Sequence, residues 1–259
     1  FFIISLYFCV KNKKKFNNKN VYLKILFLAI ASYLRPSYCL FSIYFFYSYI
    51  TEYKEKVSLA KIVMLNSILA FPAFYYVFIL DIFFIKFGGL GSNYFDKISI
   101  ISSIIFFHIF PFIITKKFKK INYRLLIISI CLSMVCVNFF NYNLSLAGGG
   151  FFLHLSNYLF NNNYIFYFLL PFFLYTLMKV IALDYKKNFL LIIILFLITP
   201  QYHIFHKYYD PIVFIIFISL INLEIKKDIF LQKKFLLLSY GLFTFHYLIS
   251  FINTFYFKF

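Results

Sequence analysis

Charged residues are scarce in this chain. They make up 13% of its 259 residues, whereas 63% of the residues are hydrophobic. A soluble domain is about 25% charged and about 45–50% apolar, so the composition excludes a soluble globular fold. Disorder is excluded too, because disordered segments combine low hydrophobicity with high charge. The composition therefore predicts an all-α, polytopic membrane protein, and at roughly 20 apolar residues per span the chain has room for about nine or ten spans.

Tryptophan is absent, and only Arg35 and Arg124 among the 26 basic residues are arginine. Ile, Phe, Tyr, Asn and Lys are abundant, and all five have AT-rich codons. The 42 Phe and 24 Tyr are therefore interpreted as packing or lipid-facing residues rather than as stacking platforms. The net charge of +18 comes from lysine clusters between apolar runs. No basic stretch lies outside that membrane context, so we expect no nucleic-acid partner.

Several kinds of site are missing. The four cysteines lie in apolar runs without a Cys-x-x-Cys pattern, which indicates packing rather than disulfides. There is no glycine loop before Lys-Ser/Thr, which argues against an ATPase. His203 and His206 are three residues apart, but no third ligand adjoins them and a His-Glu-x-x-His pattern is absent. The sequence thus predicts no metal and no cofactor, and His108 and His246, inside apolar runs, are interpreted as packing or hydrogen-bonded histidines.

Apolar runs alternate with polar or charged segments along the chain. Charged loops are expected at 11–20 and 184–188, among others. The 30 residues from 21 to 50 would form a helix of about 45 Å, too long for a bilayer of roughly 30 Å. Pro36 also disfavours helix at Arg35, so we predict two short helices that form a hairpin at Arg35-Pro36. The predicted membrane segments are residues 1–10, 21–50, 62–85, 98–115, 121–140, 164–183, 189–198, 212–223 and 235–257.

With that hairpin, the loops alternate consistently between two sides. One side receives 19 of the 26 Lys and Arg and the other receives 5, with two at the ends of spans. Cytoplasmic loops carry an excess of Lys and Arg, so 116–120 should face the cytoplasm and 148–163 the outside. We expect an integral protein of the bacterial inner membrane with its active face periplasmic. Because residues 1–10 resemble the end of a span, residues 1–259 are interpreted as one transmembrane domain, a C-terminal fragment of a longer protein.

The chemically distinctive residues gather on the predicted outer side. Arg35 stands in an apolar setting, where a guanidinium binds phosphate bidentately, caps a helix or reaches the headgroups. The glycines at 88–91 suit a tight turn, or a site on the outer face. Those at 148–150 suit a hinge, a plain turn or a close backbone approach to a ligand. His154 and Asn157 lie one turn apart if their segment is an interfacial helix.

The segment 206–211 adds a cation, phenols and a carboxylate at a membrane boundary. A lipid phosphate together with a sugar hydroxyl would use such a set of groups. The alternative is the polar end of a span. Arg35, His206, Lys207 and Asp210 are expected to converge on one outward-facing cavity that opens sideways to lipid.

Three of these segments resemble, in order, motifs of the GT-C glycosyltransferases. Residues 34–37, Leu-Arg-Pro-Ser, resemble the Leu-Thr-Lys/Arg-Pro/Gly turn that follows a short helix in that superfamily. Two further segments resemble the dolichyl-phosphate-glucose α-1,2-glucosyltransferases. Residues 87–93 are similar to an Asn-Gly-Gly-Ile-x-x-Gly-Asp segment, without its leading Asn or its Asp. Residues 206–209 are similar to an Asn-Arg-His-Tyr segment, in which Lys207 replaces the arginine and a tyrosine replaces the histidine.

This resemblance implies a hexosyltransferase that moves a sugar from a polyprenyl-phosphate donor to a glycan or lipid acceptor on the non-cytoplasmic face. The two cations would neutralise the lipid phosphate, and Asp210, His206 and Asn157 would contact sugar hydroxyls. The acidic residues of the superfamily lie in an early outer loop, which would precede Phe1, so the general base is expected upstream. The expected substrate-binding residues are Arg35, His154, Asn157, His206, Lys207 and Asp210.

Three other classes remain open. A polysaccharide polymerase would share the spans, but it normally has a large, arginine-rich outer loop, which is not found here. A transporter or flippase of lipid-linked sugar would carry charge at mid-membrane on broken helices, often with inverted repeats. This chain has no internal repeat, and its charge lies at the outer boundary. A passive structural membrane protein would tolerate replacement of Arg35.

Overall fold

The computed structural model describes residues 1–14, 16–52, 58–75, 93–113, 121–142, 148–198, 204–206, 209–210, 212–221 and 232–256. In these ranges the protein is helical and contains no strand, which confirms the all-α class. The helices are α1 (Phe2–Lys14), α2 (Asn18–Leu34), the 3₁₀ helix η1 (Pro36–Leu40), α3 (Phe41–Glu52), α4 (Leu59–Phe74), α5 (Tyr94–Ile113), α6 (Tyr123–Asn138), α7 (Gly150–Phe160), α8 (Tyr164–Leu183), α9 (Tyr185–Leu197), α10 (Ile212–Ser219) and α11 (Lys233–Tyr256).

The break at Arg35-Pro36 is confirmed. Helix α2 ends at Leu34, and Arg35 adopts an extended conformation with φ −142° and ψ 98°. Pro36 then opens the 3₁₀ helix that leads into α3. The conformation of Arg35 is the one that a following proline favours, since the proline ring disfavours the α region for the residue before it.

Several other boundaries test the sequence pattern. The run 164–183 coincides with α8, Tyr164–Leu183. The predicted loop 11–20 is wrong, because α1 continues to Lys14 and α2 begins at Asn18. The predicted loop 184–188 is also wrong, because Asp184 caps α9, which begins at Tyr185. Lysine is a good helix former whose ammonium group reaches water from a helical position, so lysine clusters do not end these helices. The segments 88–91 and 116–120 lie outside the described residues.

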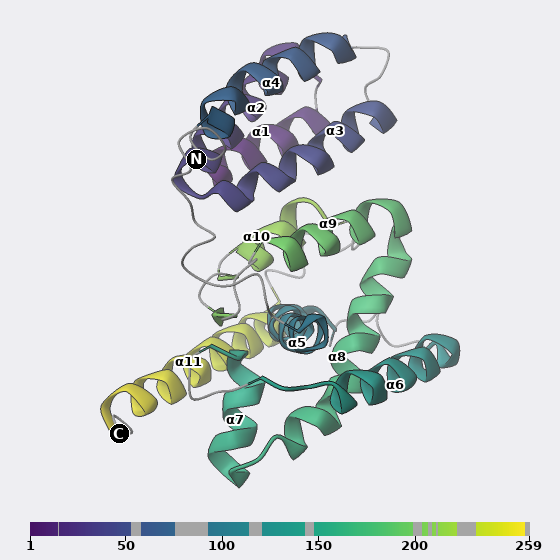
Figure 1. The fold of residues 1–259 in the computed structure, drawn as a ribbon, viewed down its shortest axis with the longest axis vertical. Helices are drawn as coiled ribbons and strands as arrows, with labels where there is room; N and C mark the ends of the chain where they lie inside the picture. The colour runs from purple at the N-terminus through teal and green to yellow at the C-terminus, as the bar shows by residue number, and fades with distance from the viewer. Residues whose placement is uncertain are drawn as a thin grey trace.

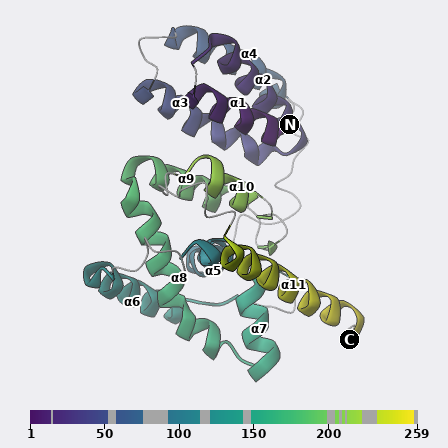
Figure 2. The same ribbon diagram turned by 180° about the vertical axis from the view of Figure 1, so that it is seen from behind.

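Helices α1 to α4 form a group in which successive helices run back and forth (Figure 1). The same arrangement is seen from behind in Figure 2. A small apolar core of Val21, Ile25, Tyr49 and Ile62 lies inside this group. Lys24 is buried in it as well, with its Nζ 4.3 Å from the ring centroid of Phe45 and 4.1 Å from that of Tyr49. These cation–π contacts compensate a buried ammonium in an apolar setting.

Helix α5 is the centre of the rest of the molecule. It packs against α6, α7, α8, α9, α10 and α11, and Figure 1 views it end-on with these helices around it. Its buried residues belong to the main apolar core, including Ile100, Ile101, Ile104, Ile105 and Phe112. A polar side chain on α5 that faces its neighbours therefore lies among apolar groups and needs a partner.

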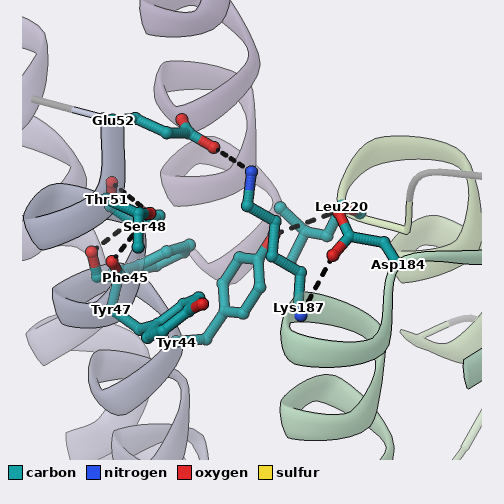
Figure 3. Close-up of polar contacts among 9 residues, drawn as sticks. All are labelled: Tyr44, Phe45, Tyr47, Ser48, Thr51, Glu52, Asp184, Lys187 and Leu220. Atoms are coloured by element: carbon teal, nitrogen blue, oxygen red, sulfur yellow. Dashed lines mark hydrogen bonds and ion pairs between the residues drawn. The ribbon is translucent and has the colours of Figure 1, made fainter.

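The α1–α4 group meets the α5-centred part through the main apolar core, to which Leu6, Leu28 and Phe41 also belong. Polar contacts, shown in close-up in Figure 3, add to this junction. Lys187 Nζ at the start of α9 lies 2.6 Å from Glu52 Oε1 at the end of α3. Nearby, the Tyr44 hydroxyl donates to the carbonyl of Leu220 over 3.4 Å. Both ends of the Glu52–Lys187 ion pair come from segments that the charge pattern assigns to the same, inner side.

Two helices of the described ranges, α5 and α8, are long and apolar enough to cross a membrane by length and composition. Most of α5 is buried in the protein, whereas α8 exposes an apolar stripe at Tyr164, Phe168 and Phe172. A stripe of residues four apart on one helix face suits contact with lipid. Figure 1 shows α5 end-on and α8 lengthwise, so these two helices cross. Membrane association is thus supported by two helices, and the larger number of nine or ten spans stays a prediction.

Candidate functional site

His108 lies on α5 in the interior of the protein. Its side chain is 0% exposed. Its Nδ1 lies 2.8 Å from the carbonyl oxygen of Ile104, one turn earlier on the same helix. A carbonyl oxygen can only accept, so Nδ1 carries a proton and donates it to Ile104. In the neutral imidazole this leaves Nε2 without a proton, and Nε2 points toward the loop before α10.

That loop brings His206 and Asp210 to α5. The backbone N–H groups of Tyr209 and Asp210 donate to the carbonyl of His206, over 2.9 and 3.3 Å. This turn places both side chains on the side that faces His108. Asp210 Oδ1 contacts His108 Nε2, and Asp210 Oδ2 lies 3.5 Å from His206 Nε2. The Asp210 side chain remains 31% exposed, so the cluster of His108, His206 and Asp210 can be reached from outside.

The contact between His108 and Asp210 requires a cation or a proton. His108 Nε2 in the neutral ring and a carboxylate oxygen are both acceptors, and two acceptors do not attract each other. The contact is favourable in two cases. Either a second proton makes His108 an imidazolium, or a metal ion lies between the two atoms.

His206 is a buried ring without a hydrogen bond. Its side chain is 9% exposed, and neither ring nitrogen has a hydrogen-bond partner within the described residues. The ring is edge-on to Phe107 at 5.1 Å and stacks on His246 at 4.6 Å between centroids. Burial, followed by the charge of His108, lowers the pKa of His206 to about 3. His206 is therefore neutral at physiological pH, with a lone pair available on one nitrogen.

Asp210 remains a carboxylate in this cluster. Burial alone would raise the pKa of its carboxyl group, but the hydrogen bond with His108 and the charges of the nearby histidines together lower it. The cluster thus presents one negative charge and two imidazoles. The ligand atoms of its three residues all lie within 4.8 Å of one another, a spacing that suits a metal ion.

The glycines at 148–150 hold the segment that leads into His206. The N–H of Gly149 donates to the carbonyl of Ile204 over 2.9 Å, and the N–H of Ile204 donates to the Tyr142 hydroxyl over 3.3 Å. Gly148 has φ +89°, and a Cβ there would collide with the Tyr142 hydroxyl and lie 2.9 Å from the carbonyl oxygen of Ile204. The backbone thus approaches another part of the chain closely at these glycines, whereas the expected approach to a ligand stays a prediction.

His154 lies on α7 beside this turn. Its Nε2–H donates to the carbonyl of Gly148 over 2.6 Å. Burial lowers the pKa of His154, although the hydrogen bond to Gly148 acts in the opposite direction. The charge of His154 also acts on His206 and His246. Four of the five histidines of the chain thus belong to one neighbourhood around α5.

No contact with the cluster is seen for the remaining expected site residues within the described ranges. Arg35 is at the α2–η1 break, with its Cζ 5.4 Å from the ring centroid of Tyr38. Asn157 is half-buried on α7, and its carbonyl accepts the N–H of Asn161 over 2.8 Å. Lys207 is outside the described residues. The structure therefore unites His206 with Asp210, and the convergence of Arg35 and Lys207 on them stays a prediction.

Sequence reasoning missed His108 and His246. Both lie within apolar runs, where a histidine is more often a packing residue. One signal was present, because an ionisable residue in a membrane segment is by default a candidate for function. Its partner, Asp210, is 102 residues away, and no local pattern connects the two.

An apolar cavity lies on another side of α5. It has a volume of about 580 Å³ and lies between α5, α6 and α8. Its lining includes Phe106, Phe168, Phe172 and Tyr175, and it contains none of the residues expected to bind substrate. This cavity is therefore separate from the His–Asp cluster, although Phe106 is two residues from His108.

Comparisons of the chain with protein-family models, with curated proteins and with solved structures found no match. The resemblance to GT-C enzymes accordingly depends on three short segments. Residues 34–37 are described completely, and 206–209 are described at His206 and Tyr209.

Proposed function

We propose that the chain is a membrane glycosyltransferase that moves a sugar from a polyprenyl-phosphate donor to a glycan or lipid acceptor. The observation that supports this most is the cluster of His108, His206 and Asp210. His206 and Asp210 were expected at the substrate from their motif, and they lie together in an otherwise apolar part of the protein. Buried ionisable groups are costly in such surroundings, so their presence favours a functional role.

The cluster has chemistry that suits a sugar. A carboxylate accepts hydrogen bonds from hydroxyl groups, and a neutral imidazole accepts or donates one. Asp210 is exposed enough to meet a substrate hydroxyl, and its contact with the buried His108 ring fixes the orientation of the carboxylate. His206, with Asn157 and His154 on α7, would line the same region.

The lipid phosphate is assigned to Arg35 and Lys207. A guanidinium binds two phosphate oxygens at once, and positive charge stabilises the phosphate as it leaves the sugar. The exposed apolar stripe of α8 is consistent with a protein that remains in the bilayer with its substrate. We place the active face on the periplasmic side of a bacterial inner membrane, following the distribution of lysines.

The test is sugar transfer by the full-length protein in proteoliposomes, with a panel of polyprenyl-phosphate hexoses that carry radiolabelled sugars. Arg35→Ala removes one charge-assisted contact, worth about 1.5–3 kcal/mol, and should lower turnover roughly 10- to 150-fold. Arg35→Lys should recover part of the activity, because lysine keeps the charge but loses the bidentate geometry.

Arg124→Ala is the matched control, since Arg124 is the other arginine and is exposed at the start of α6. Its activity should equal that of the wild type. Equal transfer by the Arg35→Ala variant would overturn the lipid-phosphate assignment. Failure of every hexose donor, together with no binding of polyprenyl phosphate itself, would overturn the transferase.

A further inference from the structure

We propose that His108, His206 and Asp210 form a binding site for a divalent transition-metal ion, best suited to zinc, with a fourth position open to solvent or substrate. The inference comes from the positions of the ligand atoms and does not depend on the proposed transferase. The sequence predicted no metal, because His206 was paired only with His203 and no third ligand adjoined them. The site proposed here pairs His206 with His108 and Asp210 instead.

The orientation of the His108 ring is typical of a metal ligand. Its Nδ1–H donates to the carbonyl of Ile104, over 2.8 Å. Histidines that bind metals usually donate the other ring N–H to a carbonyl or carboxylate, which fixes the tautomer and the direction of the ring. In the neutral ring the lone pair of Nε2 faces Asp210, and a metal ion bound by both atoms would turn two facing acceptors into two ligands.

The distance between the ligand atoms of His206 and Asp210 also suits a metal ion. His206 Nε2 and Asp210 Oδ2 are 3.5 Å apart and make no hydrogen bond. Two neighbouring ligand atoms of a tetrahedral zinc ion, each about 2.0–2.2 Å from the metal, are roughly 3.4 Å apart. The observed separation is therefore suitable for two ligands of one ion. All three ligand atoms lie within 4.8 Å of one another, close enough to be ligands of one ion.

The burial and hydrogen bonding of His206 also favour a metal ion. This side chain is nine-tenths buried, and neither ring nitrogen has a hydrogen-bond partner in the part of the chain that the structure describes. Buried polar atoms without partners are rare, and each one calls for an explanation such as an ion. A metal ion beside Asp210 would satisfy one of these nitrogens. The stacked ring of His246 holds His206 in place from the other side.

The donor types select the metal. Two imidazoles and one carboxylate suit zinc and its neighbours, whereas magnesium and calcium prefer oxygen ligands. Three protein ligands leave a tetrahedral ion with one open position, which is typical of reactive rather than purely structural sites. Asp210 provides the route of entry, because it is the exposed member of the three.

The experiment uses the full chain purified in detergent, stripped with a chelator and dialysed. Zinc is then titrated in competition with a chromophoric chelator, and cobalt is added separately so that its visible absorption reports a tetrahedral site. We expect one zinc ion per chain. His206→Ala and Asp210→Asn should each weaken zinc binding about 100-fold or more, since changes even beyond the direct ligands cost about 10–100-fold.

Cys131→Ser is the matched control. Cys131 is an exposed thiol on α6 that could bind zinc but lies outside the cluster, so this variant should bind zinc like the wild type. Asp210→Asn preserves the shape of the side chain, and circular dichroism with size-exclusion elution identifies variants that have not folded. Failure of the folded wild type to compete for zinc would overturn the proposal. Wild-type affinity in both ligand variants, or equal loss in Cys131→Ser, would overturn it as well, because the zinc would then bind elsewhere.

Discussion

At the scale of single residues, Gly148 has the most restrictive surroundings of the glycines described above. Its φ of +89° is a conformation that L side chains rarely adopt. The space for a Cβ is also filled by the Tyr142 hydroxyl and the Ile204 carbonyl. These same groups hold the segment that presents His206. A side chain at this position would thus disturb both the backbone and the approach to the His–Asp cluster.

We expect Gly148→Ala to lower the free energy of unfolding by at least about 1–3 kcal/mol, the cost of a residue forced into a rare backbone conformation. Gly241→Ala is the control, because a Cβ at Gly241 on α11 meets nothing within 4 Å. Alanine there should be neutral or stabilise the helix by about 0.5–1 kcal/mol. Thermal unfolding in detergent measures both. A Gly148→Ala protein as stable as the wild type would contradict the close packing of this turn.

The sequence predicted some residues of the cluster and missed others for a physical reason. His206 and Asp210 stand in a polar segment next to a proline, and local composition marks them. His108 stands in an apolar helix, and its role depends on a carboxylate that only the folded chain brings near. Arg35 was correctly placed at a break between helices, because the effect of Pro36 on its neighbour is local. Tertiary pairing over long stretches has no such local signal.

At the scale of elements, α7 shows how a short helix is fixed against the site. It is 11 residues long, too short to cross a bilayer of roughly 30 Å. It begins where Gly149 and Gly150 have positive φ, and His154 on its first turns donates back to Gly148. The sequence predicted an outer segment here and allowed a helix, but the hydrogen bond across the glycine turn could not be derived from spacing.

The hydrogen bond of His154 predicts a pH effect. Burial holds the pKa of His154 below its usual value, so the unfolded chain binds a proton more readily than the folded one. The contribution of His154 to stability is complete above its unfolded pKa of about 6.5 and is lost as the pH falls below it. We expect the wild type to lose more thermal stability between pH 7.5 and 5.5 than His154→Gln, whose amide can still donate to Gly148.

His206 and His246, the histidines that interact electrostatically with His154, remain in both proteins. The measured quantity is therefore the difference between the two pH profiles. Parallel profiles would show that His154 does not titrate with unfolding in this range. The two proteins should agree most closely at the upper end, where His154 is neutral in both states.

At the scale of the whole molecule, the α1–α4 group and the α5-centred part share the main apolar core and are also joined by polar contacts. Glu52 and Lys187 form the ion pair that joins α3 to α9. Burial alone would lower the pKa of Lys187, but the hydrogen bond and charge of Glu52 outweigh it and raise the pKa. Both side chains are about one quarter exposed, so water and salt weaken the attraction.

Reversal of either charge should lower the thermal midpoint, by an amount equivalent to about 0.2–1 kcal/mol. The double exchange, Glu52→Lys with Lys187→Glu, should recover most of the loss, and the effect should shrink in high salt. Lys186→Glu, an exposed neighbour on the same helix, is the control and should change little. Additive losses in the double exchange would show that the pair does not couple the two parts.

The pairing of His108 with Asp210 also has a consequence in time. The two residues are 102 positions apart, and ribosomes add about 5–20 residues each second. For roughly 5–20 s of every synthesis, α5 exists with His108 while Asp210 has not yet been made. During that interval His108 can contact Ile104 but not Asp210. The cluster of His108, His206 and Asp210 is therefore complete only after residue 210 has been added to the chain.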